Sequence, residues 1–170
     1  MDLKDFIRDV PDFPQKGILF RDITPILKNP DAFKEVITRI QEKCSGLIFD
    51  TIIGVESRGF IFGAPLACQM GKSFVPVRKE GKLPGDTISA SYSLEYGTST
   101  LEIHTGDITP GNRVLIIDDL LATGGTIEAT AELVEKSQGL VAGIGLVIEL
   151  AGLGGRDRLN KYEVFSLIQY

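Results

Sequence analysis

The strongest constraint on the fold of this chain is the run from Val114 to Thr126, VLIIDDLLATGGT. Its first four residues are apolar, a pattern typical of a strand that is buried on both faces. Asp118 and Asp119 then end the predicted strand, and a short loop rich in threonine and glycine follows. Beyond the loop, apolar residues recur at helical spacing. The run therefore predicts a strand, an acidic pair, a loop and a helix, in that order.

This order of elements predicts a site for an anion beside two hydrogen-bond acceptors. In an open α/β sheet, ligands bind just beyond the carboxyl ends of the strands. The loop from Ala122 to Thr126 would offer free backbone N–H groups to the anion, and the dipole of the following helix would add to the attraction. Asp118 and Asp119 suit sugar hydroxyls or a metal ion. A phosphorylated sugar fits all of these groups, whereas the alternative is a turn with two solvated carboxylates.

Hydrophobic periodicity predicts further strands and helices elsewhere in the chain. Helices are predicted over 2–9, 31–44, 59–70 and after the Thr/Gly loop, and strands over 51–55, 74–77, 89–94, 98–105, 114–117, 140–148 and 163–168. Apolar and polar residues alternate along 89–94 and 98–105, which predicts that these two strands form an antiparallel pair. Strands that alternate with helices predict an α/β fold with a mostly parallel sheet. At 170 residues, with no linker or repeat, the chain is expected to form a single domain over 1–170.

Composition and charge exclude several classes of function. The net charge of −5 argues against a nucleic-acid binder that works by neutralising phosphates. The chain opens without the basic and apolar segments of a secretory signal, and no apolar run approaches the roughly 20 residues that span a bilayer. Cys44 and Cys68 lack metal-ligand spacing, so both are predicted to be small buried residues of a cytoplasmic protein.

Two further segments carry residues suited to an anionic ligand. Glu56-Ser57-Arg58-Gly59 follows a predicted strand, as the acidic pair does, so Arg58 is expected to face the same crevice. The segment from Arg78 to Lys82 places three cations beside a glycine on a predicted mobile loop, which would suit a polyphosphate. Alone, the first segment could be a surface turn and the second a solvated charged face.

Together these motifs resemble a known family. The run from Val114 to Thr126 is similar to the phosphoribosyl-diphosphate (PRPP) signature of type I phosphoribosyltransferases. Over its whole length the chain resembles the members of that family that use adenine. The motifs that carry this narrower resemblance are FPQKGILFRDITP (13–25), ESRGF (56–60), RKEGKLPG (78–85), LEYG (94–97) and DDLLATGGT (118–126). Two residues depart mildly from these motifs. Some relatives carry Asp where this chain has Glu56, and others carry Pro where it has Glu80.

The resemblance implies a fold, a reaction and a site. The implied fold is a mostly parallel twisted sheet flanked by helices, with a small N-terminal base-binding hood over about residues 1–35 and a flexible antiparallel loop. The implied reaction is a pentosyl transfer of purine salvage, in which adenine and PRPP give AMP and pyrophosphate with Mg²⁺. A homodimer in the cytoplasm is also implied, in which part of the basic loop could serve the neighbouring subunit. No nucleic-acid or membrane partner is expected, and Mg²⁺ would be held mainly through PRPP rather than by protein ligands.

The resemblance also assigns a role to each site residue. The implied catalytic residues are Glu95, Asp118 and Asp119, and the implied 5′-phosphate loop is Ala122, Thr123, Gly124, Gly125 and Thr126. Pyrophosphate would contact Arg58, Arg78, Lys79 and Lys82, and adenine would contact Leu19, Phe20, Arg21 and Leu120. Tyr96 would lie on a loop that closes over the site, with Glu95 near the nitrogens of the base.

Two other functions compete with this interpretation. The nearer one is a phosphoribosyltransferase for another base, such as xanthine, hypoxanthine or orotate. The other is a non-catalytic PRPP-sensing regulator, which would usually carry a separate DNA-binding domain. The acidic charge of the chain and the Phe20-Arg21 motif before the first core strand argue against the regulator.

Overall fold

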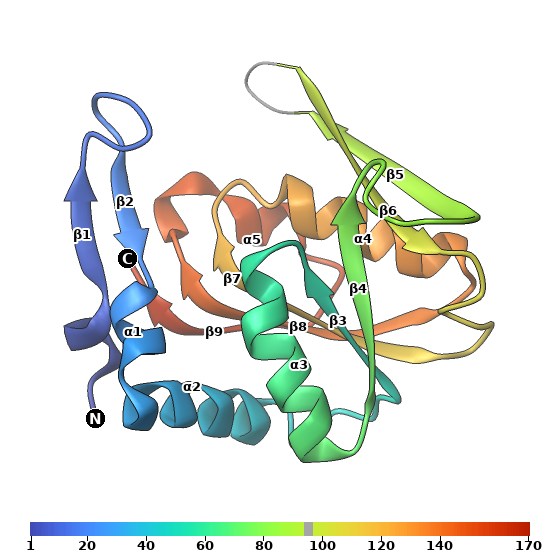
Figure 1. Cartoon of the computed structure of the whole chain (residues 1–170), viewed down its shortest axis with the longest axis horizontal. Helices are drawn as coiled ribbons and strands as arrows, with labels where there is room; N and C mark the ends of the chain where they lie inside the picture. The colour runs from blue at the N-terminus through green and yellow to red at the C-terminus, as the bar shows by residue number, and fades with distance from the viewer. Residues whose placement is uncertain (94–96) are drawn as a thin grey trace. The chain divides into compact units, whose positions relative to one another are not determined.

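The computed structural model describes residues 1–93 and 97–170, and the chain divides into two compact units, residues 1–39 and 40–170. The first unit begins with a short 3₁₀ helix and a two-stranded antiparallel sheet (Figure 1). Its elements are η1 (Leu3–Phe6), β1 (Arg8–Pro11), β2 (Leu19–Asp22), α1 (Thr24–Lys28) and most of α2 (Pro30–Lys43), which continues into the second unit.

The predicted helix over 2–9 is wrong. Its first half is the single 3₁₀ turn η1, which Asp2 caps by accepting a hydrogen bond from the Lys4 N–H at 3.0 Å. The chain then becomes extended and pairs as β1 with β2, a strand that periodicity did not predict. Side-chain pairing across the hairpin accounts for the difference, because Arg8 lies 2.5 Å from Asp22 and Arg21 forms an ion pair with Asp9.

The second unit is built on a seven-stranded sheet of order β5-β6-β4-β3-β7-β8-β9. The strands β4, β3, β7, β8 and β9 run parallel, and the hairpin β5–β6 joins the β4 edge antiparallel. Its elements are β3 (Thr51–Val55), α3 (Arg58–Met70), β4 (Ser73–Lys79), β5 (Thr87–Ser93), β6 (Thr98–His104), β7 (Arg113–Leu121), α4 (Gly125–Lys136), β8 (Leu140–Glu149), η2 (Ala151–Leu153), α5 (Gly155–Arg158) and β9 (Val164–Gln169). The predicted α/β fold with a mostly parallel sheet is confirmed.

Strand order creates a switch point between β3 and β7. From β3 the chain crosses through α3 to β4 on one side, and from β7 it crosses through α4 to β8 on the other. Because such crossovers are right-handed, the two helices cover opposite faces of the sheet. Figure 1 shows α3 in front of the sheet and α4 behind it. A ligand crevice is expected where the carboxyl ends of β3 and β7 diverge.

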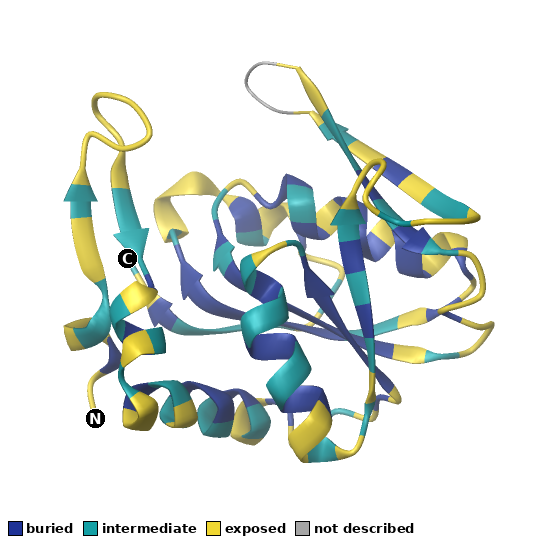
Figure 2. Ribbon diagram, in the orientation of Figure 1, coloured by how far each residue is buried: buried dark blue, intermediate teal, exposed yellow. Residues whose placement is uncertain are grey.

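The core explains why these central strands are so apolar. All five residues of β3 are buried, and so are the four apolar residues that open the Val114–Thr126 run (Figure 2). Helix α4 buries Ile127, Ala131 and Val134 against the sheet, as the helical spacing predicted. Among the described residues, no helix combines the length and apolar character that crossing a bilayer requires.

Three local predictions need correction. Strand β7 continues to Leu121, so the acidic pair lies within the strand and does not end it. Arg78 and Lys79 are the last residues of β4, where they pair with β6, and are not part of a loop. Cys44 is buried as predicted, but Cys68 is exposed because it lies on the outward face of α3 near its end.

Candidate active site

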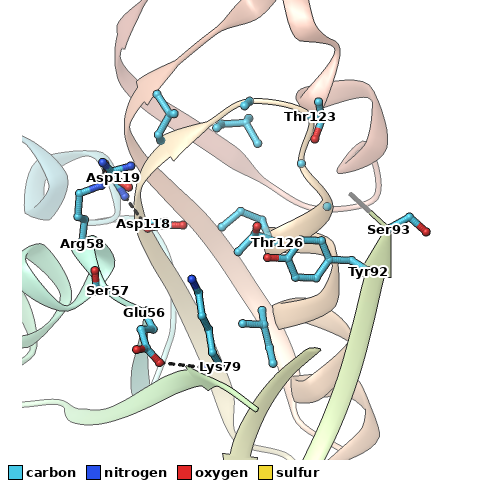
Figure 3. A pocket seen from close by; sticks show the side chains of 17 residues that line it. Glu56, Ser57, Arg58, Lys79, Tyr92, Ser93, Asp118, Asp119, Thr123 and Thr126 are labelled. Atoms are coloured by element: carbon cyan, nitrogen blue, oxygen red, sulfur yellow. Dashed lines mark hydrogen bonds and ion pairs between the residues drawn. The ribbon is translucent and has the colours of Figure 1, made fainter. Parts of the chain in front are cut away.

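A cavity of about 470 Å³ lies at the predicted switch point (Figure 3). The segment that follows β3, the end of β4, the end of β5 and the turn from β7 into α4 form its walls. Three sequence motifs that lie far apart in the chain therefore meet around one space. Within residues 1–93 and 97–170, every residue that lines the cavity belongs to the second unit.

The acidic pair forms one wall of the cavity and is tied to the neighbouring segment. The Arg58 Nε lies 2.7 Å from a carboxylate oxygen of Asp119 (Figure 3). The Asp119 N–H donates to the Asp118 carboxylate at 2.8 Å. A Cβ on Gly59 would lie 2.7 Å from the Ile117 carbonyl oxygen, so only glycine lets α3 start this close to β7. The two segments of the switch point are thus in direct contact.

Burial shifts the protonation of both carboxyl groups. Desolvation raises the pKa of Asp118 well above its usual value, and the negative charge of Asp119 raises it further. Desolvation also raises the pKa of Asp119, although the Arg58 guanidinium opposes this. Perturbed carboxyl groups that line a cavity are typical of functional sites.

The loop after the acidic pair has the geometry of an anion cradle. Gly124 has a φ of +85°, a left-handed conformation that favours glycine, and α4 begins at the next residue. The start of this 12-residue helix faces the cavity, and the hydroxyl-bearing Thr123 and Thr126 also line it. Backbone N–H groups, hydroxyls and the helix dipole therefore converge on one end of the cavity.

Glu56 connects the segment after β3 to the basic end of β4. One Glu56 carboxylate oxygen accepts from the Lys79 N–H at 2.8 Å and from the Arg78 Nε at 3.3 Å. Partial burial would raise the pKa of Glu56, but these hydrogen bonds outweigh it and the net shift is downward. Arg78 also donates to the Lys82 carbonyl oxygen at 3.2 Å. Figure 3 shows the Lys79 side chain extending into the cavity.

The structure brings most of the predicted site residues of the second unit together. The cavity is lined by Arg58, Lys79, Asp118, Asp119, Leu120 and all five residues of the loop over 122–126. Arg78 and Lys82 do not line it, because Arg78 is held between Glu56 and the Lys82 backbone. Leu19, Phe20 and Arg21 lie on β2 of the first unit. Glu95 and Tyr96 lie outside the described residues.

Seven lining residues were not predicted as site residues: Glu56, Ser57, Tyr92, Ser93, Leu101, Leu121 and Ile127. Ser57 immediately precedes α3, within a motif that was singled out for its arginine. Tyr92 and Ser93 end β5, and alternation along that strand predicted a hairpin without indicating that the end of β5 borders the cavity. The position of Tyr92 and Ser93 beside the cavity can be recognised only from the tertiary structure, in which the hairpin lies against α4.

The donor set bears on whether the site suits a metal ion. Among residues 1–93 and 97–170, no group of three or more His, Cys, Asp or Glu side chains is placed to hold one. Asp118 and Asp119 are two carboxylates, and one of them is already paired with Arg58. Mg²⁺ commonly binds to one or two carboxylates, water and substrate phosphates. The acidic pair therefore fits a Mg²⁺ ion that arrives with a phosphorylated ligand.

Comparison with known proteins identifies the class to which this fold and site belong. The family model described as the phosphoribosyl transferase domain matches residues 22–170. The chain therefore belongs to the phosphoribosyltransferase family.

Its close relatives narrow the group further. The adenine phosphoribosyltransferase of Kosmotoga olearia is 56% identical over 170 residues, which cover 100% of both chains. The crystal structure of adenine phosphoribosyltransferase from Thermoanaerobacter pseudethanolicus is 53% identical, has a TM-score of 0.97 and matches over 99% of this chain and 98% of that chain. The Saccharomyces cerevisiae adenine phosphoribosyltransferase, solved in complex with an imino-altritol bisphosphate and adenine, is 44% identical, with a TM-score of 0.92 over 98% of this chain and 96% of that one. The resemblance to family members that use adenine is thereby confirmed.

Proposed function

We propose that this protein transfers the 5-phosphoribosyl group of PRPP to adenine and so forms AMP and pyrophosphate. The observation that carries the proposal is the position of the Asp118–Asp119 pair, between a glycine-rich helix start and the cations Arg58 and Lys79. This cavity offers separate groups to a phosphate, to ribose hydroxyls and to a diphosphate. The full-length relatives that are adenine phosphoribosyltransferases support adenine as the base.

The 5′-phosphate is assigned to the loop from Ala122 to Thr126. Its backbone N–H groups and two hydroxyls suit three phosphate oxygens, and the dipole of α4 favours negative charge there. The ribose 2- and 3-hydroxyls are assigned to Asp118 and Asp119, which accept hydrogen bonds when ionised. These roles require the two carboxylates to stay beside the loop, as β7 holds them.

The diphosphate is assigned to Arg58, Lys79, Arg78 and Lys82. Arg58 and Lys79 line the cavity directly, whereas Glu56 holds Arg78 at its margin. Mg²⁺ would be held through the diphosphate with the acidic pair, and when bound it neutralises charge on the phosphate oxygens.

Adenine is assigned to Leu19, Phe20, Arg21 and Leu120. Leu120 lines the cavity, and in the first unit the β1–β2 hairpin exposes apolar side chains, including Leu19, that a planar base could cover. We infer that residues 1–35 form the base-binding hood of one domain that spans 1–170. Glu95, near the base nitrogens, and Tyr96, on a closing loop, are retained as proposals from the family motif.

The chemistry follows from the charges that develop in the transition state. The bond from ribose C1 to the diphosphate oxygen breaks as the bond from C1 to the adenine nitrogen forms. Positive charge grows on the sugar and negative charge on the leaving group. The carboxylates Asp118 and Asp119 stabilise the first, and the cations Arg58 and Lys79 stabilise the second. The proton lost from the base nitrogen is assigned to a nearby carboxylate, for which Glu95 is the candidate.

We also propose that the protein acts as a homodimer, as the family motifs imply. In that arrangement part of the basic segment 78–82 would serve the neighbouring subunit. Sedimentation that gives the mass of two chains supports this, and a monomer that retains full activity contradicts it.

The direct test is product formation by the purified protein. Adenine, PRPP and Mg²⁺ should yield AMP and pyrophosphate, whereas hypoxanthine, guanine, xanthine and orotate should yield little nucleotide. Preference for one of the other bases would contradict the assigned base specificity. PRPP binding without turnover on any base would instead favour the regulator.

A further inference from the structure

The helical turn α5 packs against the loop over 122–126, and none of its residues is among those that line the cavity. A Cβ on Gly155 would lie 2.3 Å from the Ala122 carbonyl oxygen, and a Cβ on Gly124 would lie 2.9 Å from the Gly155 carbonyl oxygen. Gly155 is buried. Two backbone segments are therefore in direct contact, with no room for a side chain between them.

Two neighbouring residues anchor α5 to the sheet. Arg156 donates to both carboxylate oxygens of buried Glu149 at 2.7 and 2.5 Å, and to the Val164 carbonyl oxygen at 2.7 Å. Leu159, just after α5, is fully buried in the core. These contacts join α5 to β8 and β9, so α5 has a fixed position from which to support the loop.

Arg158 extends this contact to the first residue of α4. A Cβ on Gly125 would lie 3.2 Å from the Arg158 Nη1, and a Cβ on Gly124 would lie 3.5 Å from its Cδ. Arg158 lines a second cavity of about 510 Å³ and not the one that holds the acidic pair. Its side chain thus lies beside the glycine pair without lining the first cavity, although the two cavities share Tyr92 and Ser93 as lining residues.

The charge of Arg158 is unusual at this position. The amino end of a helix carries partial positive charge, so a guanidinium beside it is repelled. Glu128 lies 3.6 Å away, but both side chains are close to half exposed, and such pairs contribute little. An anion held by the loop would attract both the guanidinium and the helix end, and so would offset this repulsion.

From these contacts we propose that Arg158 is a positioning residue for the 5′-phosphate loop, acting together with Gly155. The proposal rests on the proposed function, because it takes the 5′-phosphate of PRPP as the anion. Gly155 sets the path of the loop through backbone contact. Arg158 packs on the glycine pair and supplies positive charge to the same point.

Steady-state kinetics of three substitutions test the charge of Arg158. We expect Arg158→Met to raise the KM for PRPP about fivefold, the effect of roughly 1 kcal/mol at a helix end. The kcat and the KM for adenine should stay within about twofold, because the side chain does not line the first cavity. Arg158→Lys keeps the charge and should restore most of the affinity. Lys161→Met, which removes another cation from the same second cavity, is the matched control and should leave all constants unchanged.

Gly155→Ala tests the backbone contact. The added methyl group must displace Ala122, so the KM for PRPP should rise by about tenfold or more if the variant folds. If it does not fold, the Arg158 series alone decides the proposal.

The outcomes separate this proposal from the proposed function. A KM for PRPP that Arg158→Met leaves unchanged in an active, folded enzyme would overturn the proposal. A fall in kcat with equal rises in the KM for PRPP and the KM for adenine, which Arg158→Lys does not reverse, would also overturn it. That pattern indicates a general loss of structure. A wild-type protein that makes no AMP overturns the proposed function, and the role of Arg158 with it.

Discussion

Asp118 is buried at the end of a central strand, where its ionised form is less stable than it would be in water. That cost is local to the site, because the four residues of β7 that precede it, 114–117, are apolar and fully buried. Under the proposed function, the same burial would strengthen the interaction of the carboxylate with charge that develops on a bound sugar. At the scale of single residues, stability and activity are therefore expected to change in opposite directions.

The effect on activity is testable with Asp118→Asn. The amide keeps the size of the side chain but removes its charge, so kcat/KM for PRPP should fall by about 10²-fold or more. Asp107→Asn, at an exposed position in the turn after β6, is the control and should behave as wild type. An undiminished rate in Asp118→Asn would contradict the assigned role.

The effect on stability has the opposite sign. Burial raises the pKa of Asp118 above its unfolded value, so this group favours the folded state at low pH and loses that contribution as the pH rises through the raised pKa. Above the raised pKa both states are ionised and the whole penalty remains. Asp118→Asn should therefore raise the Tm at pH 7 by about 2–4 °C, the shift for about 1 kcal/mol in a chain of this size. Thermal unfolding monitored by circular dichroism checks this, and a lower Tm would refute it.

Gly59 shows how a residue without a side chain can decide the geometry of the site. In most helices Gly→Ala is stabilising by about 1 kcal/mol. Here the added Cβ would lie 2.7 Å from the Ile117 carbonyl oxygen and 3.0 Å from a carboxylate oxygen of Asp118. Gly59→Ala should lower both the Tm and kcat/KM, whereas Gly46→Ala, with nothing within 4 Å, should change neither. Equal behaviour of the two variants would show that the close approach is unimportant.

At the scale of elements, the β1–β2 hairpin is the part that periodicity missed. Each strand has only four residues, and their alternation is too short to separate from a turn. Cross-strand ion pairs stabilise it, and its apolar residues Phe13, Ile18 and Leu19 remain exposed. Exposed apolar side chains on a small hairpin favour a role in binding.

The hairpin's assigned role is testable through Arg21. Arg21→Gln should raise the KM for adenine by about tenfold, the effect of one hydrogen bond to a charged group, and leave the KM for PRPP near its wild-type value. Because Arg21 also pairs with Asp9, Asp9→Asn is the matched control for loss of that ion pair alone. If calorimetry showed that PRPP affinity falls in Arg21→Gln instead, the assignment of the hairpin to the base would be wrong.

At the scale of the whole molecule, one buried carboxylate links the C-terminal strands to the site. Glu149, at the end of β8, accepts hydrogen bonds from Arg156 and Ser166, the latter at 2.6 Å. The hydrogen bond from Arg156 contributes most to lowering the Glu149 pKa from 4.5 to about 2. A depressed pKa means that the stabilisation is complete above 4.5 and is lost as the pH falls toward 2.

Glu149→Gln should lower the Tm at pH 7 by several degrees, since it leaves Arg156 without its charged partner and costs about 1–3 kcal/mol. The difference from wild type should narrow as the pH falls below 4.5. Glu132→Gln is the control, because Glu132 forms only an exposed pair with Lys136 on α4. A Tm difference that is the same at pH 7 and pH 3 would contradict the role of this ion pair.

Local patterns in the sequence were sufficient for most of the second unit. The buried run Thr51–Val55 and the helical spacing after Gly125 are strong signals, because the pattern within each segment itself indicates which faces are buried. The motif around Asp118 predicted an anion site for the same reason, since a strand, a glycine-rich loop and a helix define that geometry within one short segment. The alternation over 89–94 and 98–105 likewise predicted the hairpin β5–β6.

Only the tertiary structure decided which of these segments meet and what lies behind them. Strand order brings Arg58 to Asp119, and it places Tyr92 beside Gly125, although neither contact has a periodic signature. It also makes Arg78 a partner of Glu56 and sets Arg158 against the loop over 122–126. The physical reason is that contacts between distant segments depend on how the strands are ordered and how closely helices approach them. Local sequence determines each element, but the packing of the whole sheet determines its neighbours.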